Sequence, residues 1–233
     1  TTEEHRQRIV NLIKDYRTLL GQGVIARFDP ETYSDAVAFA RIGEGSLGGK
    51  ARGLAFMNSM LIKYRQYDKH EGVRILIPRS VVIATDYFDD FIRLNGLKYI
   101  ISQEFSDEEI LSEFVSSTVP AKLQQELKAY IQTVRTPLAV RSSSKLEDSH
   151  YQPFAGIYST YMIPYVDNGD QMLRLLLKAV KSVYASVYFA TSRAYLSSSQ
   201  NLISEEKMAV IIQEVCGTEQ DGLFFPTFSG VAR

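Results

Sequence analysis

Apolar residues recur at helical spacing in several segments, which we expect to pack as scaffold helices. The predicted helices cover residues 3–20, 34–40, 51–64, 86–94, 110–115, 120–131 and 169–188. Ser106 begins a capping box in front of the helix at 110, since Glu109 follows three residues later. These segments carry scaffold features and no candidate chemistry.

Continuous apolar runs predict buried strands. The clearest run covers residues 208–215 (MAVIIQEV), and shorter runs lie at 80–84, 138–140, 157–161 and 228–232. We expect a turn at Asp221-Gly222 and a polar loop at 197–201. Residues 36–42 make a poor strand candidate.

The 233 residues are enough for one large domain or two modest ones, and 45% are hydrophobic. The net charge of −1 excludes bulk attraction to nucleic acid or to an anionic membrane, so we expect neither as a partner. No apolar run approaches the roughly 20 residues of a membrane span. The single cysteine, Cys216, cannot form an internal disulfide, which fits a reducing, cytoplasmic compartment. The chain starts without Met and stops just after an apolar run, so we expect a piece of a longer protein, of undetermined oligomeric state.

The richest polar chemistry lies at residues 137–161. A short strand delivers Arg141, three serines follow at 142–144, and Glu147-Asp148 and Gly156 precede the second strand. An arginine fork beside hydroxyls and free backbone N–H groups suits a polyphosphate. A polar hairpin whose arginine pairs with one of the acids explains the same residues.

A second candidate is the glycine-rich segment 43–50, GEGSLGGK. Its glycines satisfy G-x-G-x-x-G, but the weak strand at 36–42 argues against a dinucleotide-binding fingerprint. Glu44 and Ala51 stand where a Walker A motif needs glycine and a hydroxyl residue. A flexible loop entering a helix with Lys50 at its N-terminus still offers N–H groups, a helix dipole and an ammonium to a phosphate. The alternative is a glycine turn with a solvated lysine.

The end of the apolar run at 208–215 offers a third feature. Gln213 and Glu214 interrupt it, and backbone groups at such a strand end can read an adenine edge. The alternative is a strand that simply runs out into a loop. Three scattered histidines and the lone cysteine lack metal-ligand spacing, so we expect no metal site among them.

Four stretches together resemble the N-terminal nucleotide-binding domain of phosphoenolpyruvate synthase and pyruvate phosphate dikinase. They are LGGKARGL at 47–54, IP at 77–78 with the following strand, VRSSSKLEDSHYQPFAG at 140–156, and MAVIIQ at 208–213 with SGVA at 229–232. The resemblance covers residues 42–233, and Arg79-Ser80 depart from the Pro-Gly-type turn usual there.

The resemblance implies an α+β, ATP-grasp-like, two-lobed nucleotide-binding domain that is C-terminally incomplete. Residues 1–41 would form an N-terminal helical extension and 42–233 the ATP-binding domain, with a possible lobe split near 135 and 205. Lys50 and Arg141 would act on the phosphates as the catalytic residues, while Glu147-Asp148 would order their loop. The nucleotide-binding residues implied by the resemblance are Gly48, Gly49, Lys50, Arg141, Ser142, Gly156, Thr160, Gln213, Glu214 and Val215.

The family implies ATP with Mg²⁺, whose ligands would lie beyond the SGVA strand and so outside this chain. It also implies a phosphohistidine domain and a pyruvate-binding barrel elsewhere in the intact protein. That protein would be a kinase with paired acceptors, either pyruvate and water or pyruvate and phosphate. His5, His70 and His150 are therefore not expected to carry phosphate, and this fragment alone is expected to be inactive. Three alternatives remain open. The same domain serves another acceptor in glucan-water dikinases and antibiotic phosphotransferases, or it is a non-catalytic regulatory module, or it is a helical scaffold with chance matches.

Overall fold

The computed structural model describes residues 5, 6, 8, 25–31, 33, 37–64, 72, 73, 75–101, 103–144, 156–198 and 206–230. The predicted helix at 3–20 therefore lies almost entirely outside the described residues, as do Glu147, Asp148 and His150.

The described strands form one six-stranded mixed sheet in the order β1-β2-β3-β6-β4-β5, and a separate hairpin of β7 and β8. The first three strands are parallel, and β6 is antiparallel to both of its neighbours, β3 and β4. The strands are β1 (Ala26–Arg27), β2 (Phe39–Ile42), β3 (Ser80–Ile83), β4 (Leu138–Ser144), β5 (Thr160–Ile163), β6 (Met208–Glu214), β7 (Thr218–Gln220) and β8 (Leu223–Phe225). Since β3 and β4 both oppose β6, the carboxyl ends of β2, β3 and β4 meet at one edge of the sheet.

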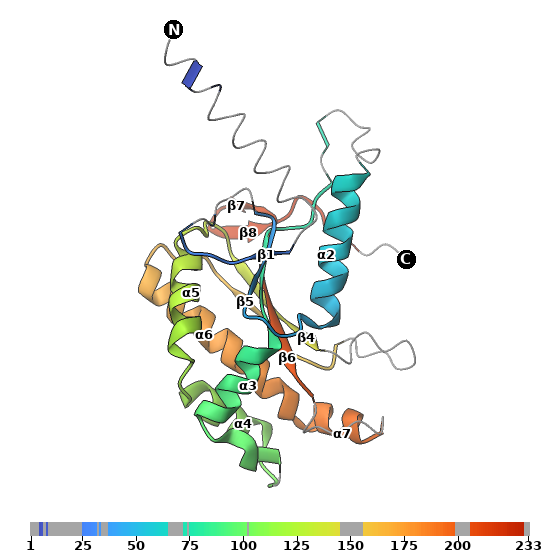
Figure 1. Ribbon diagram of the computed structural model, residues 1–233, viewed down its shortest axis with the longest axis vertical. Helices are drawn as coiled ribbons and strands as arrows, with labels where there is room; N and C mark the ends of the chain where they lie inside the picture. Colours follow the sequence, from blue (N-terminus) through green and yellow to red (C-terminus); the bar gives the residue numbers. More distant parts are fainter. Residues whose placement is uncertain are drawn as a thin grey trace.

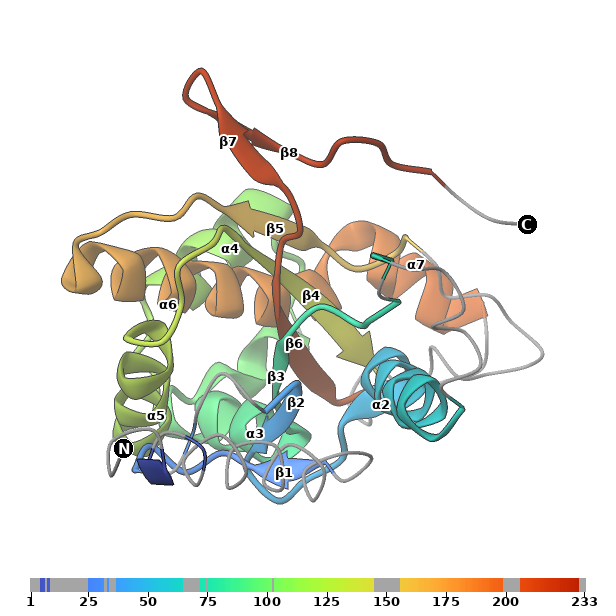
Figure 2. The ribbon, with the colours of Figure 1, turned by 90° about the horizontal axis from the view of Figure 1, so that it is seen from above.

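The described helices cover the two faces of this sheet unequally. Figure 1 shows α3, α4, α5 and α6 gathered on one side and α2 on the other, and Figure 2 shows the same layers from above. The helical elements are α2 (Gly48–Lys63), α3 (Thr85–Leu94), η2 (Leu97–Ile101), α4 (Asp107–Ser116), α5 (Ala121–Ile131), α6 (Gly169–Ala185), η4 (Ser186–Tyr188) and α7 (Ala190–Ser198).

Alternation along the strands builds two hydrophobic cores. The large core joins one face of the strands, including Val81, Val140 and Ile212, to the buried stripes of the helices. The small core lies under α2 and joins Ala51 to the opposite strand face, for example Val82 and Ile211. Residues that pair with the small-core positions of β6 therefore share the face on which α2 lies.

Two expectations at residues 34–42 are wrong. Residues 39–42 form strand β2, not the end of a helix, and the run dismissed as a poor strand pairs with β1 and β3 on its two sides. Three of its four residues are buried, so tertiary pairing overrides a weak local preference. The order β2–α2–β3 with parallel neighbouring strands is a βαβ unit, and the glycine-rich segment connects its first strand to its helix.

Most other predicted elements are confirmed, with shifted ends. The Ser106 capping box is present, the stripe of α5 is buried, and Asp221-Gly222 turns between β7 and β8. The predicted strand at 157–161 begins later, at Thr160, and the loop at 197–201 starts inside α7. Of the predicted strand at 228–232, the structure describes residues 228–230, and these form no strand, so this prediction is wrong for them.

The suggested lobe boundaries fall within one continuous sheet. Strands from before residue 135, from between 135 and 205, and from after 205 pair edge to edge in it. The hairpin of β7 and β8 follows β6 as a separate small sheet (Figure 2).

Candidate functional site

The N-terminus of α2 lies directly on β4. Gly48 has φ +70°, and a Cβ atom there would lie 2.0 Å from the Ser143 carbonyl oxygen, so this contact needs glycine. The Ser143 hydroxyl donates to the Leu47 carbonyl (2.8 Å) and accepts from the Ala51 N–H (3.0 Å). One buried serine of β4 therefore satisfies two backbone groups at the start of α2.

This contact brings Lys50 to β4. The Lys50 Nζ lies 3.1 Å from the Ser142 Oγ, which is the residue immediately after Arg141. The pairing of β4 with β5 ends at Arg141. From Ser142 onward, β4 is therefore paired on one side only, with β6. The ammonium thus lies near the carboxyl end of β4, in the first turn of α2, where the helix dipole also favours an anion.

Arg141 is the residue before Ser142, and its side chain lies on the face of the sheet that α2 covers. It pairs with Ile211 of the small core and with Thr160 of β5. Its guanidinium NH1 donates to the Gln213 Oε1 at 3.1 Å. Successive strand residues point to opposite faces of the sheet, so the side chains of Arg141 and Ser142 lie on opposite faces near the end of β4 that Lys50 contacts.

The glycine-rich segment in front of α2 is tied to the start of α3. The Glu44 N–H donates to the Asp86 carboxylate (2.9 Å), and the Ser46 N–H donates to the Thr85 hydroxyl (3.0 Å). Glu44 also pairs with Arg41 at 2.8 Å, on the exposed side of the loop. The loop therefore has a defined shape at the carboxyl ends of β2 and β3, the edge of the sheet that also carries Ser142.

The end of β6 is held from both sides. The Glu214 carboxylate accepts from the Arg79 Nε at 2.6 Å, and both side chains are largely buried. The Glu214 N–H donates to the Arg79 carbonyl and the Val215 N–H to the Pro137 carbonyl, each at 2.9 Å. Both of these N–H groups are therefore engaged within the protein.

Register places the predicted groups along one direction. Ser142 pairs with Val210, four residues before Glu214, which corresponds to about 13 Å at strand rise. Lys50, Arg141 and Ser142 thus lie toward the carboxyl end of β4, and Glu214 and Val215 lie toward its other end, while Gln213 contacts Arg141. This separation is on the scale of an extended nucleoside triphosphate.

The remaining predicted residues lie around β5 and α2. Gly49 is buried in the first turn of α2, and Thr160 is exposed opposite Arg141. Gly156 is exposed with φ +83°, four residues before Thr160. Lys50, Ser142, Arg141 and Thr160 are therefore neighbours by contact or by strand pairing, whereas no described contact joins Gly156 to them.

The described part of the chain carries no metal-binding cluster of acidic, histidine or cysteine side chains and no membrane-spanning helix. No group of three or more His, Cys, Asp or Glu side chains in these residues is arranged to hold a metal ion. Among the same residues, every helix is too short or too polar to cross a bilayer.

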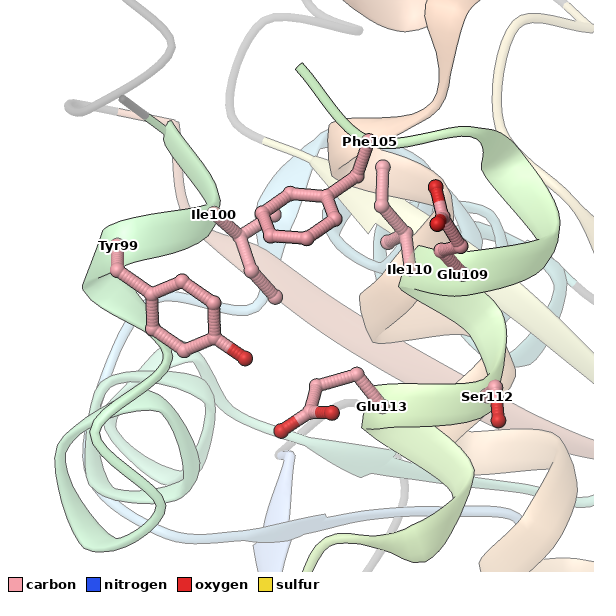
Figure 3. A pocket seen from close by; sticks show the side chains of 7 residues that line it. All are labelled: Tyr99, Ile100, Phe105, Glu109, Ile110, Ser112 and Glu113. Carbon is pink, nitrogen blue, oxygen red and sulfur yellow. The ribbon is translucent and has the colours of Figure 1, made fainter. Parts of the chain in front are cut away.

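A pocket between η2 and α4 lies on the helical side of the sheet, away from α2. Figure 3 shows Tyr99 and Phe105 lining it, with the Tyr99 hydroxyl directed toward Glu113. Desolvation, followed by a hydrogen bond to Glu113, raises the pKa of Tyr99. None of the residues predicted to bind nucleotide lines this pocket.

Comparison with known proteins assigns the family. The family model described as pyruvate phosphate dikinase, AMP/ATP-binding domain, matches residues 44–233. The chain belongs to this family. The uncharacterized phosphotransferase YvkC of Bacillus subtilis is 29% identical over 152 residues, which is 64% of this chain and 17% of that protein.

Two other relatives carry more specific names. Phosphoenolpyruvate synthase of Aeropyrum pernix is 26% identical over 200 residues, covering 77% of this chain and 22% of the relative. A probable phosphoenolpyruvate synthase of Staphylothermus marinus is 25% identical over 175 residues, covering 65% and 20%. The chain thus spans about a fifth of the length of these curated relatives, and an ATP-binding domain of a phosphotransferase family is the conclusion that they support.

Sequence reasoning missed three side chains that shape this region. Ser143 joins α2 to β4, Arg79 holds Glu214, and Ser80 accepts a hydrogen bond from Gln213 at 3.1 Å. The available signal is that Arg79-Ser80 depart from the Pro-Gly-type turn usual in the family. Their partners lie far away in the chain, so the sequence did not identify the contacts.

Proposed function

We propose that this chain binds the triphosphate of ATP between Lys50 and Arg141. The observation that carries the proposal is the contact between the Lys50 ammonium and Ser142, the strand residue next to Arg141, in a domain of an ATP-binding family. The ammonium of Lys50, the guanidinium of Arg141 and the N-terminus of α2 together oppose the charge of a polyphosphate. Phosphoryl transfer asks little covalent chemistry of the protein and depends on positioning and charge stabilisation of this kind.

In the intact protein, the phosphate would pass from ATP to a histidine of another domain and then to pyruvate, giving phosphoenolpyruvate. The names of the Aeropyrum pernix and Staphylothermus marinus relatives support this acceptor. Mg²⁺ would accompany the nucleotide and neutralise part of its charge, with ligands outside the described residues. The same ATP domain serving a glucan or an antibiotic as acceptor is the second candidate, and the domains outside this chain would distinguish the two.

Nucleotide-dependent thermal stabilisation tests the site. A ligand at a hundred times its Kd adds about 2.7 kcal/mol, which raises the Tm of a chain of this size by about 5 to 10 °C. We expect MgATP to produce this rise in the wild type, and Lys50→Met or Arg141→Met to reduce it to a small fraction without lowering the Tm of the free protein by a comparable amount.

Two matched variants control for loss of any cation. Lys63 lies at the other end of α2, and Arg174 is exposed on α6 on the opposite side of the sheet. Lys63→Met and Arg174→Met should keep the full response to MgATP. A wild-type response in both the Lys50 and the Arg141 variants would refute the assignment of the site.

A further inference from the structure

The guanidinium of Arg141 is hydrogen-bonded to the side-chain amide of Gln213 on the neighbouring strand β6. Arg141 pairs with Ile211, so Gln213 is its diagonal neighbour on the same face, within reach of two long side chains. The Arg141 NH1 donates to the Gln213 Oε1 at 3.1 Å, and Gln213 is 8% exposed. The contact therefore lies at the border between the sheet and the proposed triphosphate site.

The amide of Gln213 is itself held by a buried serine. Gln213 Nε2 donates to the Ser80 Oγ at 3.1 Å, across the pair that joins β6 to β3. The Ser80 hydroxyl donates its proton to the Pro78 carbonyl at 2.8 Å, and Ser80 is fully buried. The chain of hydrogen bonds thus crosses three strands, from β4 through β6 to β3.

The direction of this chain is fixed by its ends. A carbonyl can only accept, so the serine hydroxyl gives its single proton to Pro78 and can only accept from Gln213. The amide nitrogen must then face Ser80, and the amide oxygen must face Arg141. The reverse amide orientation would set an N–H₂ group against a guanidinium, two donors with no acceptor between them.

We propose that Gln213 is a positioning residue that orients Arg141 toward the triphosphate through the Ser80–Gln213–Arg141 relay, and that its side chain does not read the adenine. This inference rests on the proposed function and names a role for one residue of that site. A neutral amide supplies an acceptor to Arg141 without cancelling its charge, whereas a carboxylate at the same position would pair with the cation that the phosphates need. The arginine keeps its remaining N–H donors for phosphate oxygens.

Two probes separate the positioning role from base recognition. Inorganic tripolyphosphate carries the phosphates of ATP without its base, so both probes with Mg²⁺ are titrated calorimetrically into the full chain. Gln213→Met keeps the length of the side chain and removes its acceptor. We expect this variant to weaken the binding of ATP and of tripolyphosphate by the same factor, about five- to tenfold. This factor corresponds to the loss of one hydrogen bond of about 1 kcal/mol.

The other members of the relay give further expectations. Ser80→Ala should weaken the binding of both probes about two- to fivefold. The double variant Ser80→Ala with Gln213→Met should bind them no more weakly than Gln213→Met alone, because both changes act on one chain of hydrogen bonds. Gln213→Glu should weaken both probes at least as much as Gln213→Met. Ser182→Ala removes a buried serine hydroxyl that donates to a carbonyl within α6, and it should change neither affinity.

A measurement without any nucleotide separates this inference from the proposed function. The Nε–Hε resonance of Arg141, assigned by its absence in Arg141→Lys, should shift and lose order in Gln213→Met but persist in Gln213→Glu. If the resonance is unchanged in Gln213→Met, or if that variant binds tripolyphosphate normally while losing ATP, the positioning role is wrong. If the wild type binds neither probe while the resonance responds as expected, the proposed function fails and the orientation of Arg141 by Gln213 stands.

Discussion

The contact between Gly48 and β4 predicts that this glycine is indispensable for the site. In Gly48→Ala, the new Cβ would lie 2.0 Å from the Ser143 carbonyl oxygen and 2.5 Å from its carbonyl carbon, at a φ of +70°. The left-handed conformation costs a residue with a Cβ about 1 to 2 kcal/mol. Relieving the clash against backbone adds about 1 to 3 kcal/mol. We therefore expect a destabilisation of about 2 to 5 kcal/mol.

Gly53 provides a matched control in the same helix. Its Cβ would meet nothing within 4 Å, and it is exposed in the interior of α2. Gly53→Ala should stabilise the protein by about 0.5 to 1 kcal/mol, since alanine loses less backbone entropy in a helix. Urea unfolding gives both values, with unchanged m-values showing that the unfolded states are alike.

The consequence for binding follows from the same contact. To avoid Ser143, the start of α2 must move away from β4, which separates Lys50 from Ser142. Gly48→Ala should therefore lose the response to MgATP even at a temperature at which it is fully folded, while Gly53→Ala keeps it. The reasoning is refuted if Gly48→Ala is as stable as Gly53→Ala, or if it is destabilised and still binds MgATP with wild-type affinity.

The remaining predictions concern stability. Arg79→Met should destabilise the protein by about 3 kcal/mol, because it leaves the Glu214 carboxylate, only 18% exposed, without its cation. In a double-mutant cycle measured by urea unfolding, the double variant Arg79→Met with Glu214→Met should be much less destabilised than the sum of the two single variants. Additive values would contradict the pairing. Hydrogen bonds from the Ser106 N–H and then its hydroxyl lower the pKa of Glu109 from 4.5, so its stabilising contribution is present above about pH 4.5 and is lost as the pH falls through the lowered pKa. The urea midpoint of Glu109→Gln should accordingly fall less steeply than that of the wild type between about pH 5 and pH 3, whereas Glu108→Gln should follow the wild type; equal slopes in all three proteins would exclude this origin.

The candidate site was predictable in its parts but not in its assembly. The cations Lys50 and Arg141 were selected from local chemistry and from family resemblance, and the structure connects them through Ser142. Neither the serine that seats α2 nor the relay that orients Arg141 was predicted, because each contact joins segments 72 to 133 residues apart in the chain. The strand at 39–42 was missed for the same reason, since its neighbours in the sheet decide its conformation.

The sequence by itself determined the features that depend on neighbours a few residues away. The amphipathic stripes of α3, α5 and α6, the Ser106 capping box and the buried run of β6 all follow from periodicity and local hydrogen bonding. The tertiary structure decided which strands lie side by side, and so which side chains share a face. Pairing β4 and β3 with β6 places Arg141, Gln213 and Ser80 on one face of the sheet, and the approach of Gly48 to Ser143 brings Lys50 to Ser142. Strand order follows from the burial of the whole sheet rather than from any local pattern, and for this reason only the folded chain brings the site together.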